Sequence, residues 1–205
     1  MGAIVNGLSL LNLRSFGSTY LAFSDYMLPS LRMAALENIP DALSLYAPDG
    51  AWEEGTTYWN YATKYEAFLV STLVSALGSD MGVFDVPGMR NTCETMLSLI
   101  GSAGYTFNFS DANVDSLNTA AFCFLADRLN RPELAKRRAT VRLRSREDRE
   151  LDMIWLSRFD YNNEDIKMPL DIYSRGIETV TMRSSWEKSG MYIGMHTGDN
   201  AATHS

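Results

Sequence analysis

Cysteine and histidine are scarce in this chain. Its 205 residues include only two of each, so at most one Cys2His2 set could form and it would use all four, and we expect no metal quartet in this chain. Cys93 and Cys123 both lie in apolar stretches of helical character. We predict that they are buried free thiols, and a single disulfide between adjacent helices is the alternative.

Basic residues and long apolar runs are scarce as well. The chain has 18 Lys and Arg against 25 Asp and Glu, which gives a net charge of -7. This balance argues against a general nucleic-acid or anionic-membrane surface, since both partners attract clustered Lys and Arg. No apolar run reaches the roughly 20 residues that cross a membrane, and residues 1–7 lack the features of a signal peptide. As written, the chain would be cytoplasmic, but the sequence does not determine its compartment. We expect no nucleic-acid or membrane partners.

Helical periodicity dominates what is present, and a hydrophobic content of 46% is ample for a packed core. From Tyr58 onward, bulky side chains recur at three- and four-residue steps, which predicts a helix as far as Leu77-Gly78. Before this helix, Pro48-Asp49-Gly50 predicts a turn in which glycine takes a positive φ. Tyr58, Tyr61 and Tyr65 would share one face of the helix. They either pack with their hydroxyls reaching solvent or backbone, or form a site for chemistry or sugar binding.

Further helices and one hairpin follow from local patterns. Asp85 and Pro87 predict the cap and first turn of a helix that runs to Gly101. Its inner face would carry apolar residues at helical spacing, namely Met89, Cys93, Met96, Leu97 and Ile100. Two more helices are predicted, one over 115–129 and one from Pro132 to about Leu143. The alternating runs 177–183 and 191–196 predict a β-hairpin.

One region of the chain is basic. Its residues are either a solvated helix face paired with neighbouring carboxylates or a surface that attracts an acidic glycan. They are Lys136, Arg137, Arg138, Arg142, Arg144, Arg146 and Arg149.

Three stretches resemble, in order and rough spacing, motifs of heparinase II/III-like polysaccharide lyases. Residues 46–62 read YAPDGAWEEGTTYWNYA and resemble the family's D-G-x-x-x-E-G-x-x-Y-x-x-Y-A segment. Residues 104–112, GYTFNFSDA, resemble an aromatic loop that ends in Asp-Ala. Residues 183–186, RSSW, and 198–205, GDNAATHS, resemble a strand and the start of an H-x-H-x-D segment. The resemblance implies a mainly α chain, with an incomplete α/α toroid of helical hairpins over 41–168 and the first strands of a β-sandwich domain over 169–205.

The lyase resemblance also implies a site and a substrate. Such enzymes remove a proton beside a uronate carboxylate and expel the neighbouring oxygen, which requires a base, an acid and neutralisation of the carboxylate. The tyrosine of this chemistry matches Tyr58 first and Tyr61 second, and His204 matches an active-site histidine. The residues expected to contact an acidic polysaccharide are Trp52, Glu54, Trp59 and Asn60. A metal ion is implied only in complete members, which are often periplasmic or secreted, so we expect no metal in this chain.

The first 40 residues resemble another family. MGAIVNGLSL at the start and FGSTYLAFSDYM at 16–27 are similar to the pyrimidine-binding domain of transketolases. This resemblance implies that Tyr20, Phe23 and Tyr26 surround the aminopyrimidine ring of thiamine diphosphate. The glutamate that activates the ring would precede Met1, and the histidine- and glycine-rich loop expected after Leu36 is absent.

The sequence therefore predicts a composite chain. We expect residues 1–40 to be a transketolase-like segment that is not an independent domain, because so short a piece of an α/β domain cannot bury its own sheet. The remainder is expected to be a lyase-like fragment with little or no activity and no cofactor of its own. A thiamine-diphosphate-dependent transketolase fragment and a non-catalytic carbohydrate-binding helical module are the alternatives.

Overall fold

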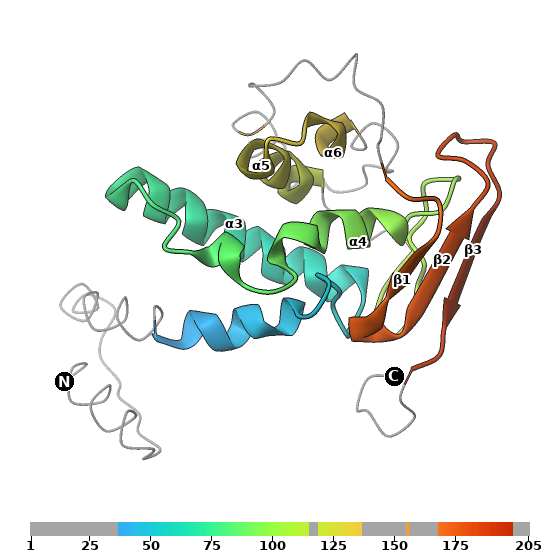
Figure 1. The fold of residues 1–205 in the computed structure, drawn as a ribbon, viewed down its shortest axis with the longest axis horizontal. Helices are drawn as coiled ribbons and strands as arrows, with labels where there is room; N and C mark the ends of the chain where they lie inside the picture. The colour runs from blue at the N-terminus through green and yellow to red at the C-terminus, as the bar shows by residue number, and fades with distance from the viewer. Residues whose placement is uncertain (1–36, 115–118, 137–154, 156–167, 199–205) are drawn as a thin grey trace. The chain divides into compact units, whose positions relative to one another are not determined.

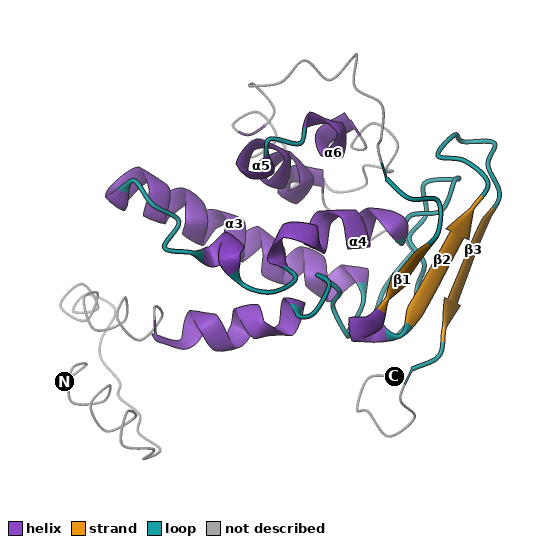
Figure 2. Ribbon diagram, viewed as in Figure 1, coloured by secondary structure: helices purple, strands orange, loops and turns teal. Residues whose placement is uncertain are grey.

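The computed structural model describes residues 37–114, 119–136, 155 and 168–198. The chain divides into two compact units, Met1–Ser44 and Leu45–Ser205. In the first unit, residues 37–43 are helical, and the hydroxyl of Ser44 donates to the carbonyl of Asp41 over 2.6 Å. The second unit is mainly helical and contains a small three-stranded antiparallel sheet (Figures 1 and 2). The toroid and the β-sandwich implied by the lyase resemblance stay predictions.

The longest helix of the second unit is α3, Thr56–Leu77, as the periodicity predicted. It follows Gly55, whose φ is 80°, and ends at Gly78, which takes the left-handed conformation and donates its N–H to the carbonyl of Val74. The side chains that face the core recur at three- and four-residue steps. They are Trp59, Thr63, Glu66, Ala67, Val70 and Leu73.

The prediction that a helix begins at Pro87 is wrong about where the helix starts. Two 3-10 turns, Val83–Asp85 and Met89–Asn91, come before helix α4, which spans Thr92–Ser98. Gly88 separates the turns with a φ of 86°, and a Cβ there would overlap the Tyr46 carbonyl. Close backbone packing therefore interrupts the helix. Its predicted apolar residues are nevertheless all buried, namely Met89, Cys93, Met96, Leu97 and Ile100.

Helices α5, Thr119–Leu129, and α6, Pro132–Lys136, complete the described helical layer. Figure 1 shows them over α3 and α4, and α5 packs on both α3 and α6. The rings of Trp59 on α3 and Phe122 on α5 lie 5.4 Å apart in the core. Cys93 and Cys123 are buried and free, which confirms the prediction of thiols rather than a disulfide. No helix in the described ranges is long and apolar enough to cross a membrane.

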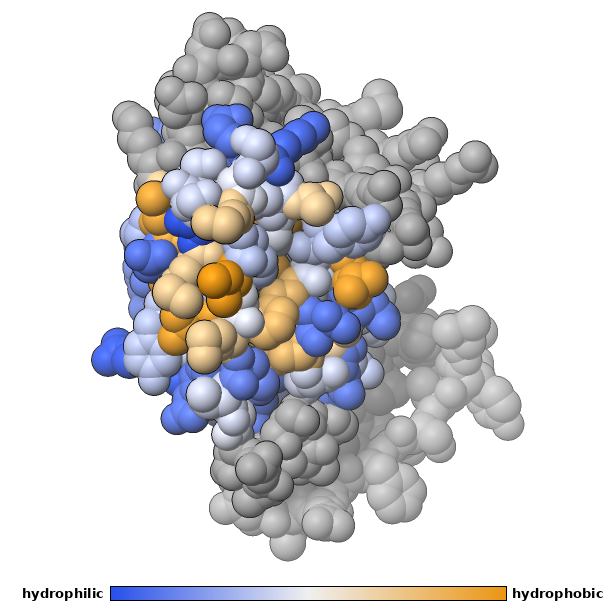
Figure 3. All heavy atoms as spheres, turned by 90° about the vertical axis from the view of Figure 1, so that its right-hand side faces the viewer, coloured by the Kyte–Doolittle hydropathy of each residue, from blue (hydrophilic) through white to orange (hydrophobic). Residues whose placement is uncertain are grey.

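The sheet has the order β1-β2-β3, with β1 at Ile172–Ser174, β2 at Thr179–Arg183 and β3 at Tyr192–His196. Strands β2 and β3 form the predicted hairpin, whereas β1, which has only three residues, was not predicted. Exposed apolar side chains on the outer face of the sheet include Tyr173, Ile193 and Met195. Figure 3 looks at the side of the molecule that carries the sheet and shows apolar residues gathered there among hydrophilic ones.

Two side chains fasten the sheet to the helices. The carboxylate of Asp49 accepts hydrogen bonds from the backbone N–H groups of Arg175 and Gly176, at 2.5 and 3.4 Å. The guanidinium of Arg183 donates to the carbonyls of Ser98 and Ile100, at 2.7 and 3.1 Å. The sheet therefore has a fixed position against the turn before α3 and the end of α4.

Candidate binding surface on helix α3

The first two lyase-like stretches meet at the N-terminus of α3. A Cβ on Gly55 would lie 2.8 Å from the Cβ of Ala112 and 3.0 Å from the carbonyl oxygen of Phe109. The backbone N–H of Asn113 donates to the Thr57 hydroxyl over 2.9 Å. The absence of a side chain at Gly55 therefore lets the loop of residues 103–114 lie directly on the start of the helix.

Strand β3 approaches the same loop from the other side. A Cβ on Gly194 would lie 2.9 Å from the ring of Phe107, so this ring packs on the strand backbone. The rings of Phe109 and His196 stack with their centroids 4.6 Å apart. The loop is thus enclosed between α3 and the sheet, and the side chains of Phe107 and Phe109 serve packing.

His196, which was expected on the strand surface, is half-buried with its ring against Phe109. Its Nδ1 lies 2.9 Å from the hydroxyl of Thr179, and that hydroxyl donates to the carbonyl of Ile177. Because a hydroxyl donates one proton, Nδ1 of His196 is the donor in their bond. Nε2 is buried and has no hydrogen-bond partner among the described residues.

The tyrosines of α3 lie on one exposed face, as the spacing predicted. The exposed fractions are 43% for Tyr58, 64% for Tyr61, 54% for Tyr65 and 38% for Phe68. The Tyr61 and Tyr65 rings meet edge to face at 4.9 Å, and Tyr65 and Phe68 lie 6.3 Å apart. A hydrogen bond with Tyr65 raises the pKa of Tyr61, which favours its hydroxyl as a proton donor over a base.

The remaining predicted contact residues lie in different environments. Trp52 is half-buried against Tyr46, and its Nε1 donates to a carboxylate oxygen of Glu54 over 3.4 Å. Trp59 is fully buried and donates to the hydroxyl of Thr92 over 2.7 Å, so its ring is a core element and is not accessible for stacking with a sugar. Asn60 is half-buried.

Several predicted residues lie outside the described part of the structure. His204 belongs to this group, and so do Tyr20, Phe23 and Tyr26, the residues assigned to the thiamine diphosphate alternative. Arg137–Arg149 of the basic region also lie outside it. Within the described residues, no group of three or more His, Cys, Asp and Glu side chains could hold a metal ion.

Sequence reasoning missed Glu66, a buried carboxyl on the inner face of α3. Burial raises its pKa to about 7, and the nearby Tyr46 hydroxyl opposes this shift only in part. Neither carboxylate oxygen has a hydrogen-bond partner of ordinary geometry among the described residues, while the Tyr46 and Thr63 hydroxyls bond to each other over 2.8 Å. The helical spacing of Trp59, Thr63, Glu66 and Val70 could have predicted this inward position.

Comparison with known proteins finds transketolases. No protein-family model matches the chain. It is 54% identical to a transketolase of Treponema pallidum over 46 residues, which are 22% of this chain and 7% of the relative. The identity to a transketolase of Bacillus subtilis is 51% over 41 residues, 20% of this chain and 6% of the relative. The identity to a transketolase of Physarum polycephalum is 33% over 106 residues, which are 48% of this chain and 16% of the relative.

These matches support a transketolase-like segment in the chain. The stretches cover only 6% to 16% of the three relatives, so the chain spans a small part of a transketolase. The Physarum match takes in nearly half of this chain, which is more than the 40 residues assigned to the segment from motifs alone. The lyase resemblance finds no support in these comparisons.

Proposed function

We propose that the transketolase-like segment retains the aromatic part of a thiamine diphosphate site. The observation that carries this proposal is the 54% identity over 46 residues to the transketolase of Treponema pallidum. By the motif resemblance, Tyr20, Phe23 and Tyr26 would contact the aminopyrimidine ring. Because the matches cover no more than 16% of the three relatives, the proposal is binding of the cofactor and not transfer of a ketol group.

Isothermal titration with thiamine diphosphate tests this proposal. We expect saturable binding that weakens at least tenfold in Tyr20→Ala and in Phe23→Ala. Tyr173→Ala is the matched control, because Tyr173 is an exposed tyrosine on the sheet. Absence of binding to folded protein, or equal binding by all variants, would overturn the proposal.

A second proposal concerns the exposed aromatic face of α3, which we propose binds carbohydrate. Four aromatic side chains, those of Tyr58, Tyr61, Tyr65 and Phe68, are at least 38% exposed on this face. Sugar rings present apolar C–H faces that stack on aromatic rings, and tyrosine adds a hydroxyl that can bind a sugar oxygen. This arrangement suits the non-catalytic module and is compatible with lyase chemistry.

Eliminative cleavage at the same surface would require a proton donor, a cation for the uronate carboxylate and a proton acceptor. Tyr58 is the first candidate to protonate the leaving oxygen and Tyr61 the second. A uronate carboxylate would need a cation, and Lys64 is near enough to act on Tyr61 electrostatically. The proton-accepting group has no candidate among these residues, so binding is better supported than cleavage.

Two measurements separate binding from cleavage. Affinity electrophoresis with neutral and uronate polysaccharides reports binding, and ultraviolet absorbance of the unsaturated uronate product reports elimination. We expect binding that is lost in Tyr61→Ala and retained in Tyr173→Ala. Product formation that disappears in Tyr58→Phe while binding remains would establish a lyase. Unaltered binding in Tyr61→Ala would exclude this face as the binding surface.

A further inference from the structure

A cavity of about 440 Å³ lies between the C-terminal half of α3 and helix α5. This volume falls in the range of roughly 300 to 1,000 Å³ that is typical of small-molecule sites. Its apolar wall is formed by Val70 and Val74 on α3, Phe124 on α5, and Trp155. A wall of two valines and two aromatic rings suits a ligand that has an apolar face.

The exposed aromatic face of α3 leads directly into this wall. The ring of Tyr61 contacts that of Tyr65, which in turn contacts Phe68. The next ring in this series is Trp155, whose centroid lies 6.0 Å from that of Phe68. Trp155 in turn lies 5.2 Å from Phe124 inside the cavity. The rings therefore form one continuous series from the surface of the helix to the cavity.

Polar groups line the rest of the cavity. Ser71 and Ser75 are one turn apart on α3 and present hydroxyls on the same side of the helix. Asp127 and Arg128 contribute one charge of each sign from α5. Among the described residues that line it, the cavity thus combines an apolar wall with hydrogen-bonding groups and has one charge of each sign.

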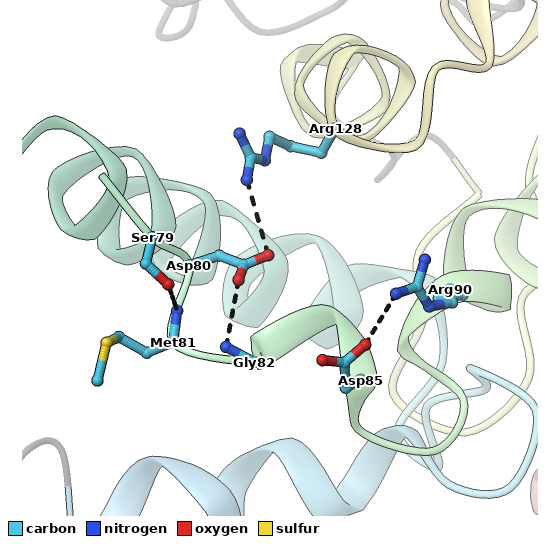
Figure 4. A network of polar contacts seen from close by, with 7 residues as sticks. All are labelled: Ser79, Asp80, Met81, Gly82, Asp85, Arg90 and Arg128. Carbon is cyan, nitrogen blue, oxygen red and sulfur yellow. Dashed lines mark hydrogen bonds and ion pairs between the residues drawn. The ribbon is translucent and has the colours of Figure 1, made fainter. Parts of the chain in front are cut away.

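Arg128 is already engaged at the edge of the cavity. Its guanidinium lies 3.6 Å from the carboxylate of Asp80 and 5.9 Å from the centroid of the Phe84 ring. Figure 4 shows Arg128 reaching from α5 toward Asp80, which also accepts a hydrogen bond from the N–H of Gly82. With Asp80 beside it and Asp127 next to it in sequence, Arg128 offers little net attraction for an anionic ligand.

We propose that this cavity binds the end unit of a neutral oligosaccharide whose other units lie along the tyrosine face of α3. A neutral sugar matches the cavity because it has apolar C–H groups for the accessible parts of Trp155 and Phe124, which are 9% and 5% exposed, and hydroxyls for Ser71 and Ser75. The inference rests on the proposed carbohydrate-binding function. It narrows the ligand to neutral glycans, in contrast to the acidic polysaccharide expected from the lyase resemblance.

The geometry also sets the length of the ligand. Tyr61 and Ser75 are 14 positions apart on the helix, which corresponds to about 21 Å along its axis. A ligand that occupies both the cavity and the tyrosines must therefore contain several sugar units. Longer oligosaccharides should bind more tightly than short ones until this distance is spanned.

Isothermal titration of the full chain with cellotriose, cellohexaose, xylohexaose, maltohexaose and a galacturonic acid hexamer tests the proposal. We expect at least one neutral hexamer to bind, with cellotriose binding more weakly than cellohexaose if the cello-series is recognised. Ser75→Phe places a ring at the cavity and should weaken binding at least tenfold. Ala76→Phe is the matched control, because Ala76 is also exposed on α3 but does not line the cavity.

The outcomes separate the cavity from the tyrosine face. Circular dichroism melting of both phenylalanine variants first establishes that they fold alike. If Tyr61→Ala abolishes binding and Ser75→Phe does not, the cavity proposal is overturned while the surface proposal stands. If the wild-type chain binds none of the oligosaccharides, both proposals fail. If the galacturonic acid hexamer binds more tightly than every neutral hexamer, the proposal that the ligand is a neutral glycan is overturned.

Discussion

At the scale of single residues, Glu66 is an uncompensated buried group. Its carboxyl lies on the inner face of α3 beside Tyr46, and burial raises its pKa from 4.5 to about 7. Between these pH values the folded chain binds more protons at this site than the unfolded chain. The free energy of unfolding contributed by Glu66 therefore falls as the pH rises from 4.5 to about 7.

Glu66→Gln should remove this pH dependence while preserving the shape of the side chain. The free energy of unfolding of the variant, relative to wild type, should increase by about 3 kcal/mol between acidic and mildly alkaline pH. Urea unfolding followed by circular dichroism at both pH values measures the change. Glu53→Gln, at an exposed position, is the control and should show no comparable change. A pH-independent difference for Glu66→Gln would contradict the assignment.

Arg183 is a second charged residue with a buried side chain, and unlike Glu66 it has hydrogen-bond partners among the described residues. Its guanidinium lies 3.6 Å from the centroid of the Trp186 ring and 5.1 Å from that of Tyr192, and donates to two backbone carbonyls. No carboxylate pairs with it in the part of the chain that the structure describes. Burial lowers its pKa, although arginine remains charged at neutral pH.

Arg183→Lys should destabilise the protein by about 2 kcal/mol, because an ammonium cannot reproduce the planar stacking or the paired donation. Thermal unfolding provides the measurement. The same substitution at the exposed Arg175, whose backbone and not its side chain bonds to Asp49, should have little effect. An equal change at both positions would show that the carbonyl contacts do not matter.

At the scale of elements, the turn before α3 is held in place by contacts that α4 makes to its backbone. The hydroxyls of Thr92 and Thr95 donate to the carbonyls of Gly50 and Asp49, each over 2.6 Å. Gly50 has a φ of 82°, and a Cβ there would overlap the backbone of Thr92. The turn and the start of α4 therefore pack closely only because residue 50 is glycine.

Gly50→Ala should cost at least about 3 kcal/mol of unfolding free energy, because both the positive φ and the overlap oppose it. Gly78→Ala is its matched control, since Gly78 also has a positive φ but its Cβ would meet no atom within 4 Å. We expect a cost of about 1 kcal/mol there from the backbone conformation alone. Urea unfolding of the two variants gives the comparison, and equal costs would contradict the packing argument.

Elements with strong local patterns were predictable, and those set by contacts were not. The period of α3 and the alternation of the β2–β3 hairpin follow from their own residues. The start of α4 does not, because the approach of Tyr46 to Gly88 ends the preceding turn. Strand β1 has three residues, too few to show alternation, and exists through its pairing with β2.

At the scale of the whole molecule, the two compact units should divide the proposed functions. The second unit, Leu45–Ser205, contains α3, α5 and the cavity between them. Removal of residues 1–40 should therefore abolish thiamine diphosphate binding and leave oligosaccharide binding within about twofold. Isothermal titration of the truncated chain, after circular dichroism confirms cooperative unfolding, measures both. Retained cofactor binding would show that the site is not in the first 40 residues.

The sequence by itself determined the period of α3, the turn before it and the pairing of β2 with β3, because these depend on neighbouring residues. It also carried the transketolase resemblance that the comparisons support in part. Only the tertiary structure decided which aromatic rings of α3 are accessible. Trp59 and the tyrosines are all aromatic residues of one helix, but α4 and α5 cover only the side that carries Trp59. Glu66 is buried on the inner face of the same helix, beside Tyr46, whereas Tyr58, Tyr61 and Tyr65 face solvent.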